Sequence, residues 1–302
     1  MTHIIDLVGN TPCVEIPCKK SGVQIFAKCE WFNPSGSVKD RAAANMIKRG
    51  MEAGETNNKI LIDATSGNTG IAYALYGASL GIPVELALPE NASEERKLIL
   101  NNYGVNLHLT NPLEGTDGAQ RFVDQMVADN KDKYFFPNQY GNEHNWKAHV
   151  ESTGPEIWEQ TNGEVTHFVA GLGTTGTFIG TSRFLQPKGV HCVSVEPNTP
   201  MHGLEGWKHM ETAIVPKIYD RSVADDTLVA DTARSYELAK AASKHLGLML
   251  SPSAAANLDA AIQLSEHVNS GIIITVFADN AMKYLTDAFW NDDAYNIENP
   301  FY

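Results

Sequence analysis

The sequence lacks an excess of positive charge. Lys and Arg together number 23 against 36 Asp and Glu, which gives a formal net charge of −13. An acidic chain of this kind repels nucleic-acid backbones and anionic membrane surfaces, so we expect no nucleic acid among its partners. Any anionic ligand must then be held locally, for example by helix N-termini and hydroxyl groups.

Membrane, secretion and metal signals are also missing. No apolar run is long enough to span a bilayer, and the start MTHIIDLVGNTP has no basic region followed by an apolar stretch. The four cysteines lack the CxxC pairing of a zinc site, and nothing downstream of Cys13 and Cys18 completes a ligand set. We therefore expect reduced thiols, a cytoplasmic protein, no membrane association and no bound metal.

The 302 residues, 43% of them hydrophobic, are enough for one large or two medium globular domains. Short apolar runs alternate with helical patterns, which predicts an α/β architecture with parallel sheets. The predicted strands cover 24–30, 59–65, 84–89, 106–110, 166–172, 191–197 and 272–278. The predicted helices begin near Ser37, Asn68, Ser93, Gly115, Gly176, Thr232, Ser253 and Asn280. The polar block NQYGNEHNWK, 138–147, interrupts this alternation and indicates the crossing between two domains.

The stretch NPSGSVKDRAAANM, 33–46, passes from turn residues into a helix-compatible segment. Ser37 and Asp40 have the S-x-x-[DE] spacing of a helix N-terminus, which places Lys39 in the first turn, where the helix dipole disfavours positive charge. A lysine that is readily neutral is a nucleophile suited to a Schiff base, whereas an ordinary solvated lysine is the alternative.

Two further turns precede helical patterns and are rich in hydroxyl groups. TSGNTG, 65–70, joins hydroxyls and backbone N–H groups at a helix N-terminus, which favours a carboxylate or phosphate site over a plain capped turn. GLGTTG, 171–176, fits GxGxxG, and Glu196 follows 20 residues later, as in a dinucleotide site. Thr174, Thr175 and Thr177 instead suit a phosphate monoester, and the motif alone leaves both readings open. Further on, Ser253 follows Pro252 before an Ala-rich segment and is expected to be a helix N-cap.

Together these segments resemble the cysteine synthase family, which are fold-type II pyridoxal-phosphate enzymes. NPSGSVKDRAAANMI resembles the family's lysine motif, TSGNTG its substrate-carboxylate loop, and GTTGT at 173–177 its phosphate loop in the form typical of the cysteine synthase B branch. IIDLVGNTP resembles the family's N-terminal motif. The resemblance implies two doubly wound three-layer α/β/α domains, as in tryptophan synthase β, and a homodimer. The implied domains are a smaller, mobile one over 36–141, with the carboxylate loop, and a larger one over 1–35 plus 142–302, with the phosphate loop.

The resemblance also assigns roles to residues. It implies that Lys39 forms a Schiff base with pyridoxal 5'-phosphate, that Asn68 hydrogen-bonds the ring oxygen of this cofactor, and that Ser253 faces its pyridine nitrogen. The residues implied to hold the amino-acid carboxylate are Thr65, Ser66, Thr69 and Gln139. The residues implied to hold the cofactor phosphate are Gly173, Thr174, Thr175, Gly176 and Thr177.

The implied activity is that of a cysteine synthase. Lys39 would remove the α-proton of an O-activated L-serine, O-acetylserine or O-phosphoserine, and the bound aminoacrylate would accept sulfide to give L-cysteine. A hydroxyl facing the pyridine nitrogen makes the ring a restrained electron sink, which favours β-elimination. Alternatives within the family are a cysteine desulfhydrase and synthases that form β-cyanoalanine or cystathionine. A dinucleotide-binding oxidoreductase would explain only the 171–176 motif.

Two departures from the family pattern concern the substrate. Ser-Pro-Ser-Ala-Ala at 251–255 replaces the usual Gly-Ile-Ser-Ser-Gly but keeps the hydroxyl of Ser253. The segment 201–220 is longer than in the commonest cysteine synthases and resembles that of synthases using O-phosphoserine, in which a basic residue reads the phosphate. Lys208, with His209 beside it, is the predicted counterpart of that residue.

Overall fold

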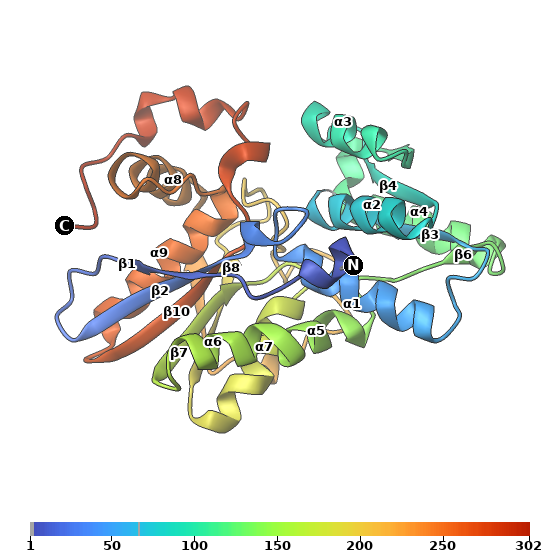
Figure 1. Cartoon of the computed structure of the whole chain (residues 1–302). Coiled ribbons are helices and arrows are strands. Elements are labelled where there is room, and N and C mark those ends of the chain that lie inside the picture. Colours follow the sequence, from blue (N-terminus) through green and yellow to red (C-terminus); the bar gives the residue numbers. More distant parts are fainter. Residues whose placement is uncertain (1–2, 66) are drawn as a thin grey trace. The chain divides into compact units, whose positions relative to one another are not determined.

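A computed structural model describes residues 3–65 and 67–302 (Figure 1), and the chain forms two compact units. The smaller unit contains the N-terminal segment up to Val8, then Asn33–Ser35 and Lys39–Asn145. The larger unit contains Gly9–Phe32, Gly36–Val38 and Trp146–Tyr302. Each unit is built around its own sheet.

The smaller unit has a four-stranded parallel sheet in the order β5-β4-β3-β6. Its strands are β3 (Ile60–Ala64), β4 (Val84–Pro89), β5 (Asn106–Thr110) and β6 (Tyr134–Phe135), and its helices are α1 (Lys39–Glu52), α2 (Asn68–Leu80), α3 (Glu94–Asn102) and α4 (Gly115–Asp129). Leu61 of β3 packs in a core with α1 and α2, and its neighbour Ile62 packs in a second core with α4. Successive strand residues point to opposite faces, so helices cover both sides of this sheet.

The larger unit has a six-stranded sheet in the order β1-β2-β10-β7-β8-β9. Its strands are β1 (Cys13–Ile16), β2 (Val23–Cys29), β7 (Val165–Gly171), β8 (His191–Pro197), β9 (Asp226–Ala230) and β10 (Gly271–Phe277). Among the described residues, the edge strand β1 pairs antiparallel with β2, and the other strands of this sheet pair parallel. Its helices are α6 (Gly154–Gln160), α7 (Gly176–Leu185), α8 (Thr232–Leu246) and α9 (Pro252–His267). Ile273 of β10 lies in the core shared with α8 and α9, and Ile274 lies in the core shared with α6 and α7. This unit is therefore also three-layered.

All seven predicted strands are present, and β4, β5 and β8 have the predicted bounds. The sequence missed β1, β6 and β9, because they are short or mostly exposed and carry no continuous apolar run. The prediction of a helix near Asn280 was wrong, since the chain there forms only the 3₁₀ helix Ala281–Lys283, with Asn280 as its cap. The polar region around 143–160 was not expected to be helical, yet it forms α5 (Glu143–Ala148), a π-helical turn (His149–Thr153) and α6.

The division into units differs from the expected domain bounds of 36–141 and 1–35 plus 142–302. The N-terminal segment belongs to the smaller unit, where Ile5 is in the core and Asp6 pairs with Lys48. Gly36–Val38 belong to the larger unit, since Ser37 pairs with Asp279 and the Val38 N–H donates to the Ala278 carbonyl over 2.8 Å. The boundary after Asn145 falls within the helix α5, inside the predicted crossing.

Candidate active site

Lys39 is the first residue of α1 and is half-buried. The residues before it are attached to the end of β10: Ser37 forms an antiparallel bridge with Asp279, and Lys283 Nζ donates to the Gly36 carbonyl over 3.3 Å. The backbone that enters α1 is therefore fixed by contacts of the larger unit, immediately before the lysine. This agrees with the predicted placement of Lys39 at a helix start.

The carboxylate of Asp40 fixes the other side of Lys39. It accepts hydrogen bonds from the Ser35 N–H (2.9 Å), from the Ser35 hydroxyl (2.6 Å) and from the Tyr76 hydroxyl on α2. The Asp40 side chain thus reaches back to Ser35, while the Ser37 backbone takes part in the bridge to Asp279. The first turn of α1 is thus tied both to the preceding turn and to α2.

The TSGNTG loop runs from the end of β3 into α2. Thr65 Oγ1 accepts hydrogen bonds from the N–H groups of Gly67 and Gly70, each over 3.2 Å. A Cβ on Gly70 would lie 2.6 Å from Thr65 Cγ2, so only glycine lets the threonine fold back over the start of the helix. Asn68 is the first residue of α2. Ser66, the fourth predicted carboxylate ligand, lies outside the described residues.

Gln139 joins this loop from 70 residues away. Its Oε1 accepts from Thr69 Oγ1 over 2.8 Å, and its Nε2 donates to the Ala64 carbonyl over 2.6 Å. Thr65, Thr69 and Gln139 are all buried, at 3%, 4% and 2% exposure. The structure therefore gathers the three described residues of the predicted carboxylate site at the N-terminus of α2, where the helix dipole favours an anion.

The predicted phosphate loop, Gly173–Thr177, connects β7 to the N-terminus of α7. A Cβ on Gly173 would lie 2.0 Å from the Gly206 carbonyl oxygen, which excludes a side chain there. Thr175 has left-handed backbone angles (φ 73°, ψ −11°) and does not cap α7 with its side chain. Its buried Oγ1 has no hydrogen-bond partner among the described residues. A buried hydroxyl without a partner, beside the N–H groups of a helix start, fits a phosphate.

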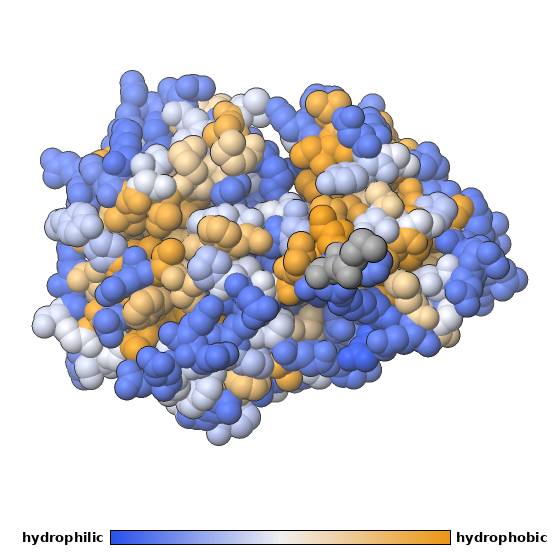
Figure 2. Space-filling model, in the orientation of Figure 1, coloured by the Kyte–Doolittle hydropathy of each residue, from blue (hydrophilic) through white to orange (hydrophobic). Residues whose placement is uncertain are grey.

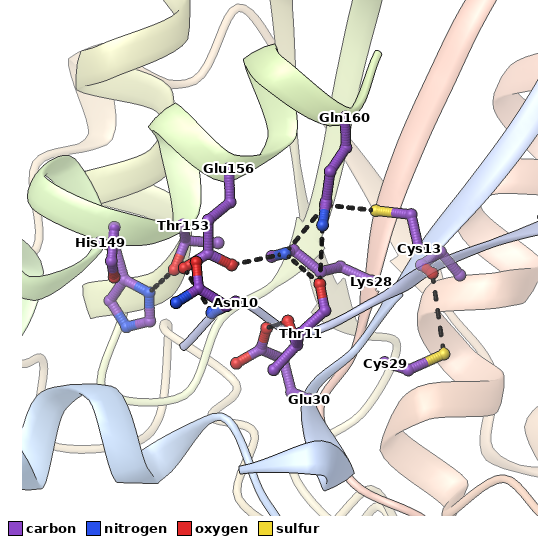
Figure 3. Close-up of polar contacts among 12 residues, drawn as sticks. Asn10, Thr11, Cys13, Lys28, Cys29, Glu30, His149, Thr153, Glu156 and Gln160 are labelled. Atoms are coloured by element: carbon purple, nitrogen blue, oxygen red, sulfur yellow. Dashed lines mark hydrogen bonds and ion pairs between the residues drawn. The ribbon is translucent and has the colours of Figure 1, made fainter. Parts of the chain in front are cut away.

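Sequence reasoning missed His149, which lies behind this loop. Its Nε2 is 3.3 Å from Thr177 Oγ1. On the other side of the ring, its Nδ1 is 2.8 Å from Thr153 Oγ1, a contact drawn in Figure 3. Gly180 of α7 permits this contact, because a Cβ there would lie 2.0 Å from the Trp146 carbonyl oxygen and 2.7 Å from His149 Cβ. The only sign of this contact in the sequence is the small residue Gly180 within α7. The polar region that contains His149 is not predicted to be helical from the sequence.

The expected capping role of Ser253 is corrected. Ser251 is the N-cap of α9, with its Oγ accepting from the Ala254 N–H over 3.2 Å, and Pro252 occupies the first helical position, which proline favours. Ser253 is the second residue of the helix, 5% exposed, and its Oγ is 3.2 Å from Ser251 Oγ. Its hydroxyl is thus not used as the helix cap.

Asn257, one turn further along α9, links the helix to two strands. It accepts from the Gly171 N–H at the end of β7 over 2.8 Å and donates to the Val276 carbonyl of β10 over 2.7 Å. Sequence reasoning did not single it out, because an asparagine within a helix carries no distinctive pattern. Its effect is to hold the start of α9, and with it Ser253, in register with the strand that leads into the phosphate loop.

Lys208 and the preceding Trp207 contact Gly171 and Leu172, the two residues that lead into the phosphate loop. The Lys208 N–H donates to the Leu172 carbonyl over 2.8 Å, and the Trp207 ring occupies the position of a Cβ on Gly171. Lys208 is 8% exposed. The neighbouring His209 instead contacts Thr212, with 3.0 Å between Nδ1 and Oγ1. Glu196, the residue of the dinucleotide alternative, accepts from the Met210 N–H over 3.3 Å in this same segment.

A buried ion pair supports the N-terminal GNTP motif in the larger unit (Figure 3). Lys28 Nζ lies 2.6 Å from Glu156 Oε2 on α6 and donates to the Thr11 carbonyl over 2.8 Å and to Gln160 Oε1 over 3.0 Å. The Lys28 side chain is fully buried, so these oxygens satisfy a charge that would otherwise be costly to bury. The cluster joins β2 and the segment that precedes β1 to α6.

Neither a metal site nor a membrane span is found in the described part of the chain. Residues 3–65 and 67–302 contain no group of three or more His, Cys, Asp and Glu side chains placed to hold an ion. No helix formed by these residues is long and apolar enough to cross a bilayer.

Comparison with known proteins identifies the family. The family model described as "Pyridoxal-phosphate dependent enzyme" matches residues 4–279. The chain is 48% identical to a cysteine synthase of Aquifex aeolicus, covering 96% of this chain and 92% of that protein, and 35% identical to cysteine synthase B of Pseudomonas aeruginosa, covering 95% and 97%. A crystal structure of cysteine synthase from Entamoeba histolytica superimposes with a TM-score of 0.91 at 33% identity, covering 97% of this chain and 91% of that one. The family's cofactor is pyridoxal phosphate, so the oxidoreductase alternative is set aside. The chain belongs to the cysteine synthase family of fold-type II pyridoxal-phosphate-dependent enzymes.

Proposed function

We propose that this protein is a cysteine synthase that replaces the β-substituent of an O-activated L-serine with sulfide. The observation that carries this proposal is the pairing of Thr69 with Gln139 beside Thr65 at the N-terminus of α2. These groups suit the carboxylate of an amino acid, which an enzyme acting on serine derivatives must hold. O-acetylserine and O-phosphoserine are the two donors we consider.

The residues that would hold the cofactor lie at or beside the starts of four helices. Lys39 would bind it covalently, Asn68 would hydrogen-bond its ring oxygen, Ser253 would face its pyridine nitrogen, and the loop Gly173–Thr177 would bind its phosphate. The fit rests on the partnerless hydroxyl of Thr175 and on Ser253, whose hydroxyl does not cap its helix. When bound, pyridoxal phosphate supplies an electron sink for the bond that breaks at the substrate Cα.

The remaining steps belong to side chains of the chain itself. Thr65 and Thr69 hold the substrate carboxylate, with the second amide proton of Gln139 available to it. Once the substrate amine has displaced Lys39 from the cofactor, the freed Lys39 amine removes the proton from Cα. Acetate or phosphate then leaves Cβ with the electrons of the Cβ–O bond, and sulfide bonds to Cβ. Lys39 returns the proton to Cα, which completes L-cysteine.

The first test is the variant Lys39→Ala. We expect loss of turnover by at least about 1000-fold, because both the covalent anchor and the base are removed. The native protein should be yellow, and its visible absorption band should disappear when borohydride is added. The variant should not show this borohydride-sensitive band. Lys48→Ala in the same helix, whose ammonium pairs with Asp6 on the surface, is the matched control and should keep normal turnover. A colourless native protein that takes up no pyridoxal phosphate would contradict the proposal.

The donor is tested at Lys208. We propose that its ammonium recognises the phosphate of O-phosphoserine, which supports use of this donor as well as, or instead of, O-acetylserine. In Lys208→Ala, we expect the ratio of kcat/KM for O-phosphoserine to that for O-acetylserine to fall by about 10-fold or more, since a charged hydrogen bond to phosphate is lost. Lys217→Ala, an exposed lysine of the same segment, is the control. An unchanged ratio in Lys208→Ala would exclude this role.

The family alternatives are separated by products. A desulfhydrase would release sulfide from cysteine faster than it forms cysteine from either activated serine, and a β-cyanoalanine or cystathionine synthase would prefer cyanide or homocysteine to sulfide. Measuring the four reactions with the same preparation decides among them.

A homodimer and a cytoplasmic location are also proposed. Ile4 and Leu7 at the N-terminus are 38% and 58% exposed, and Figure 2 shows hydrophobic residues beside the N-terminal segment, which supports an apolar contact surface. Light scattering of the purified protein tests the dimer. The four cysteines form no disulfide among themselves, which supports a reducing compartment, and localisation of a tagged chain tests it.

A further inference from the structure

Asp63 is a buried acid that the reaction steps above do not use. It is the fourth residue of β3, two positions before Thr65, and is 1% exposed. Its Oδ1 accepts from the Ala64 N–H over 2.8 Å, and its Oδ2 accepts from the Tyr73 hydroxyl of α2 over 2.9 Å and from the Gln139 N–H over 3.1 Å. Three donors from three separate segments therefore converge on one carboxylate.

Through the last of these bonds, Asp63 holds Gln139. The backbone and side chain of Gln139 are fixed at four points: its N–H by Asp63, its carbonyl by Asn145 Nδ2 (2.7 Å), its Nε2 by the Ala64 carbonyl and its Oε1 by Thr69. The preceding residue, Asn138, has a left-handed backbone (φ 52°), so the chain turns sharply into Gln139. A displaced N–H at this turn would move the side chain that contacts Thr69.

We propose that Asp63 is a positioning residue for the substrate carboxylate, acting through the Gln139 backbone on the Gln139–Thr69 pair, with Tyr73 fixing the Asp63 side chain. The inference rests on the proposed function, in which Thr65, Thr69 and Gln139 hold that carboxylate. All contacts that carry it lie within the smaller unit.

A carboxylate is the side chain that this position needs. An asparagine offers one oxygen, so its NH₂ group would face either the Ala64 N–H or the Gln139 N–H, and a buried donor would lose its acceptor. When ionised, Asp63 opposes the binding of an anion in this unit by repulsion. Its presence is therefore explained by the geometry it imposes on Gln139 and not by direct attraction for the substrate.

The test compares Asp63→Asn with a matched control. Glu85→Gln also removes a buried carboxylate, from the adjacent strand β4, where Glu85 contacts His108, Lys133 and Tyr134 and not Gln139. In Asp63→Asn we expect the KM for the donor amino acid and the dissociation constant of L-serine to rise by about 10-fold, with kcat within about threefold. In Glu85→Gln, both constants should change less than about twofold.

A double-mutant cycle with Gln139→Ala separates positioning from a general loss of structure. If Asp63 acts through the Gln139 side chain, Asp63→Asn should raise KM no further in the Gln139→Ala background, and the two effects will not add. Amide hydrogen exchange of the protein without cofactor provides a second measurement: exchange around Gln139 should be faster in Asp63→Asn and unchanged in Glu85→Gln. Additive effects on KM would overturn the inference.

The single variants Thr69→Ala and Gln139→Ala distinguish a wrong role for Asp63 from a wrong assignment of the carboxylate site. If Thr69→Ala and Gln139→Ala leave KM and L-serine binding unchanged, the carboxylate site is wrongly assigned, and the inference fails with it. If these variants weaken binding by about 10-fold or more while Asp63→Asn does not, the site stands and only the role of Asp63 is refuted.

Discussion

At the scale of single residues, two buried carboxylates, Asp40 and Asp63, form hydrogen bonds that hold the backbone beside the candidate catalytic and substrate-binding groups. Asp40 follows Lys39 and binds Ser35 and Tyr76, and Asp63 precedes the TSGNTG loop and binds Tyr73 and Gln139. In both cases a tyrosine of α2 donates to the carboxylate. The helix α2 thus contributes its hydroxyls to two carboxylates that lie 23 residues apart in the sequence.

Asp63 should make the stability of the protein depend on pH. Burial raises the pKa of Asp63 from its ordinary 3.8 to about 7, although the hydrogen bonds from Gln139, Ala64 and Tyr73 lower it. Between these values the folded state binds a proton that the unfolded state has released, so this group's contribution to stability is present at low pH and lost as pH rises through about 7. A change of this size corresponds to about 4 kcal/mol.

We expect Asp63→Asn to reduce the fall in the free energy of unfolding between pH 4 and pH 8 by up to about 4 kcal/mol. Asp124 and Tyr140, which also interact electrostatically with this cluster, remain in the variant. Denaturant unfolding at a series of pH values measures the effect. Parallel curves for the native protein and the variant would contradict it.

At the scale of elements, helix beginnings carry the candidate functional groups. α1 begins at Lys39, α2 begins within the TSGNTG loop, α7 begins within the phosphate loop and α9 begins beside Ser253. The first N–H groups of each helix have no partner within the helix, so these positions suit anions and polar atoms of a ligand. At the start of α9, Ser251 is the cap, which leaves the hydroxyl of Ser253 for the ligand role that we propose.

The variants Ser251→Ala and Ser253→Ala should therefore differ. Loss of the Ser251 cap should lower the free energy of unfolding by about 1 kcal/mol, whereas Ser253→Ala should lower it by less. Ser253→Ala should instead alter the visible absorption of the bound cofactor. Thermal unfolding and absorption spectra of both variants provide the comparison, and a larger stability loss in Ser253→Ala would restore it as the cap.

At the scale of the whole molecule, each unit has a core on both faces of its own sheet. The phosphate loop belongs to the larger unit, while Lys39 and the carboxylate loop belong to the smaller one. Ligands that bind the folded chain stabilise it by mass action. Bound cofactor should therefore raise the free energy of unfolding of this protein.

Removal of pyridoxal phosphate should lower the unfolding temperature. At a free concentration 100 times its dissociation constant, a ligand adds about 2.7 kcal/mol, which corresponds to several degrees for a chain of this size. Calorimetry before removal, after removal and after reconstitution measures the effect. Pyridoxal lacking the phosphate is the control and should restore less. Equal recovery with both compounds would contradict the assigned role of the loop Gly173–Thr177.

The sequence by itself determined the family, the alternating strands and helices, and the order of the functional motifs. These depend on local patterns: short stretches rich in apolar residues form β4 and β8, and the glycines and hydroxyls of TSGNTG and GTTGT mark loops before helices. Lys39 and Asn68 were placed at helix starts for the same reason.

The tertiary structure alone decided which distant residues meet. Gln139 contacts Thr69 across 70 positions, Asp63 contacts Gln139 across 76, and Lys28 pairs with Glu156, a residue of a helix that local sequence did not predict. It also showed that Ser251, and not Ser253, caps α9, and that Gly36–Val38 pair with the end of β10. Such contacts depend on strand register and on the packing of helices, which only the folded chain specifies.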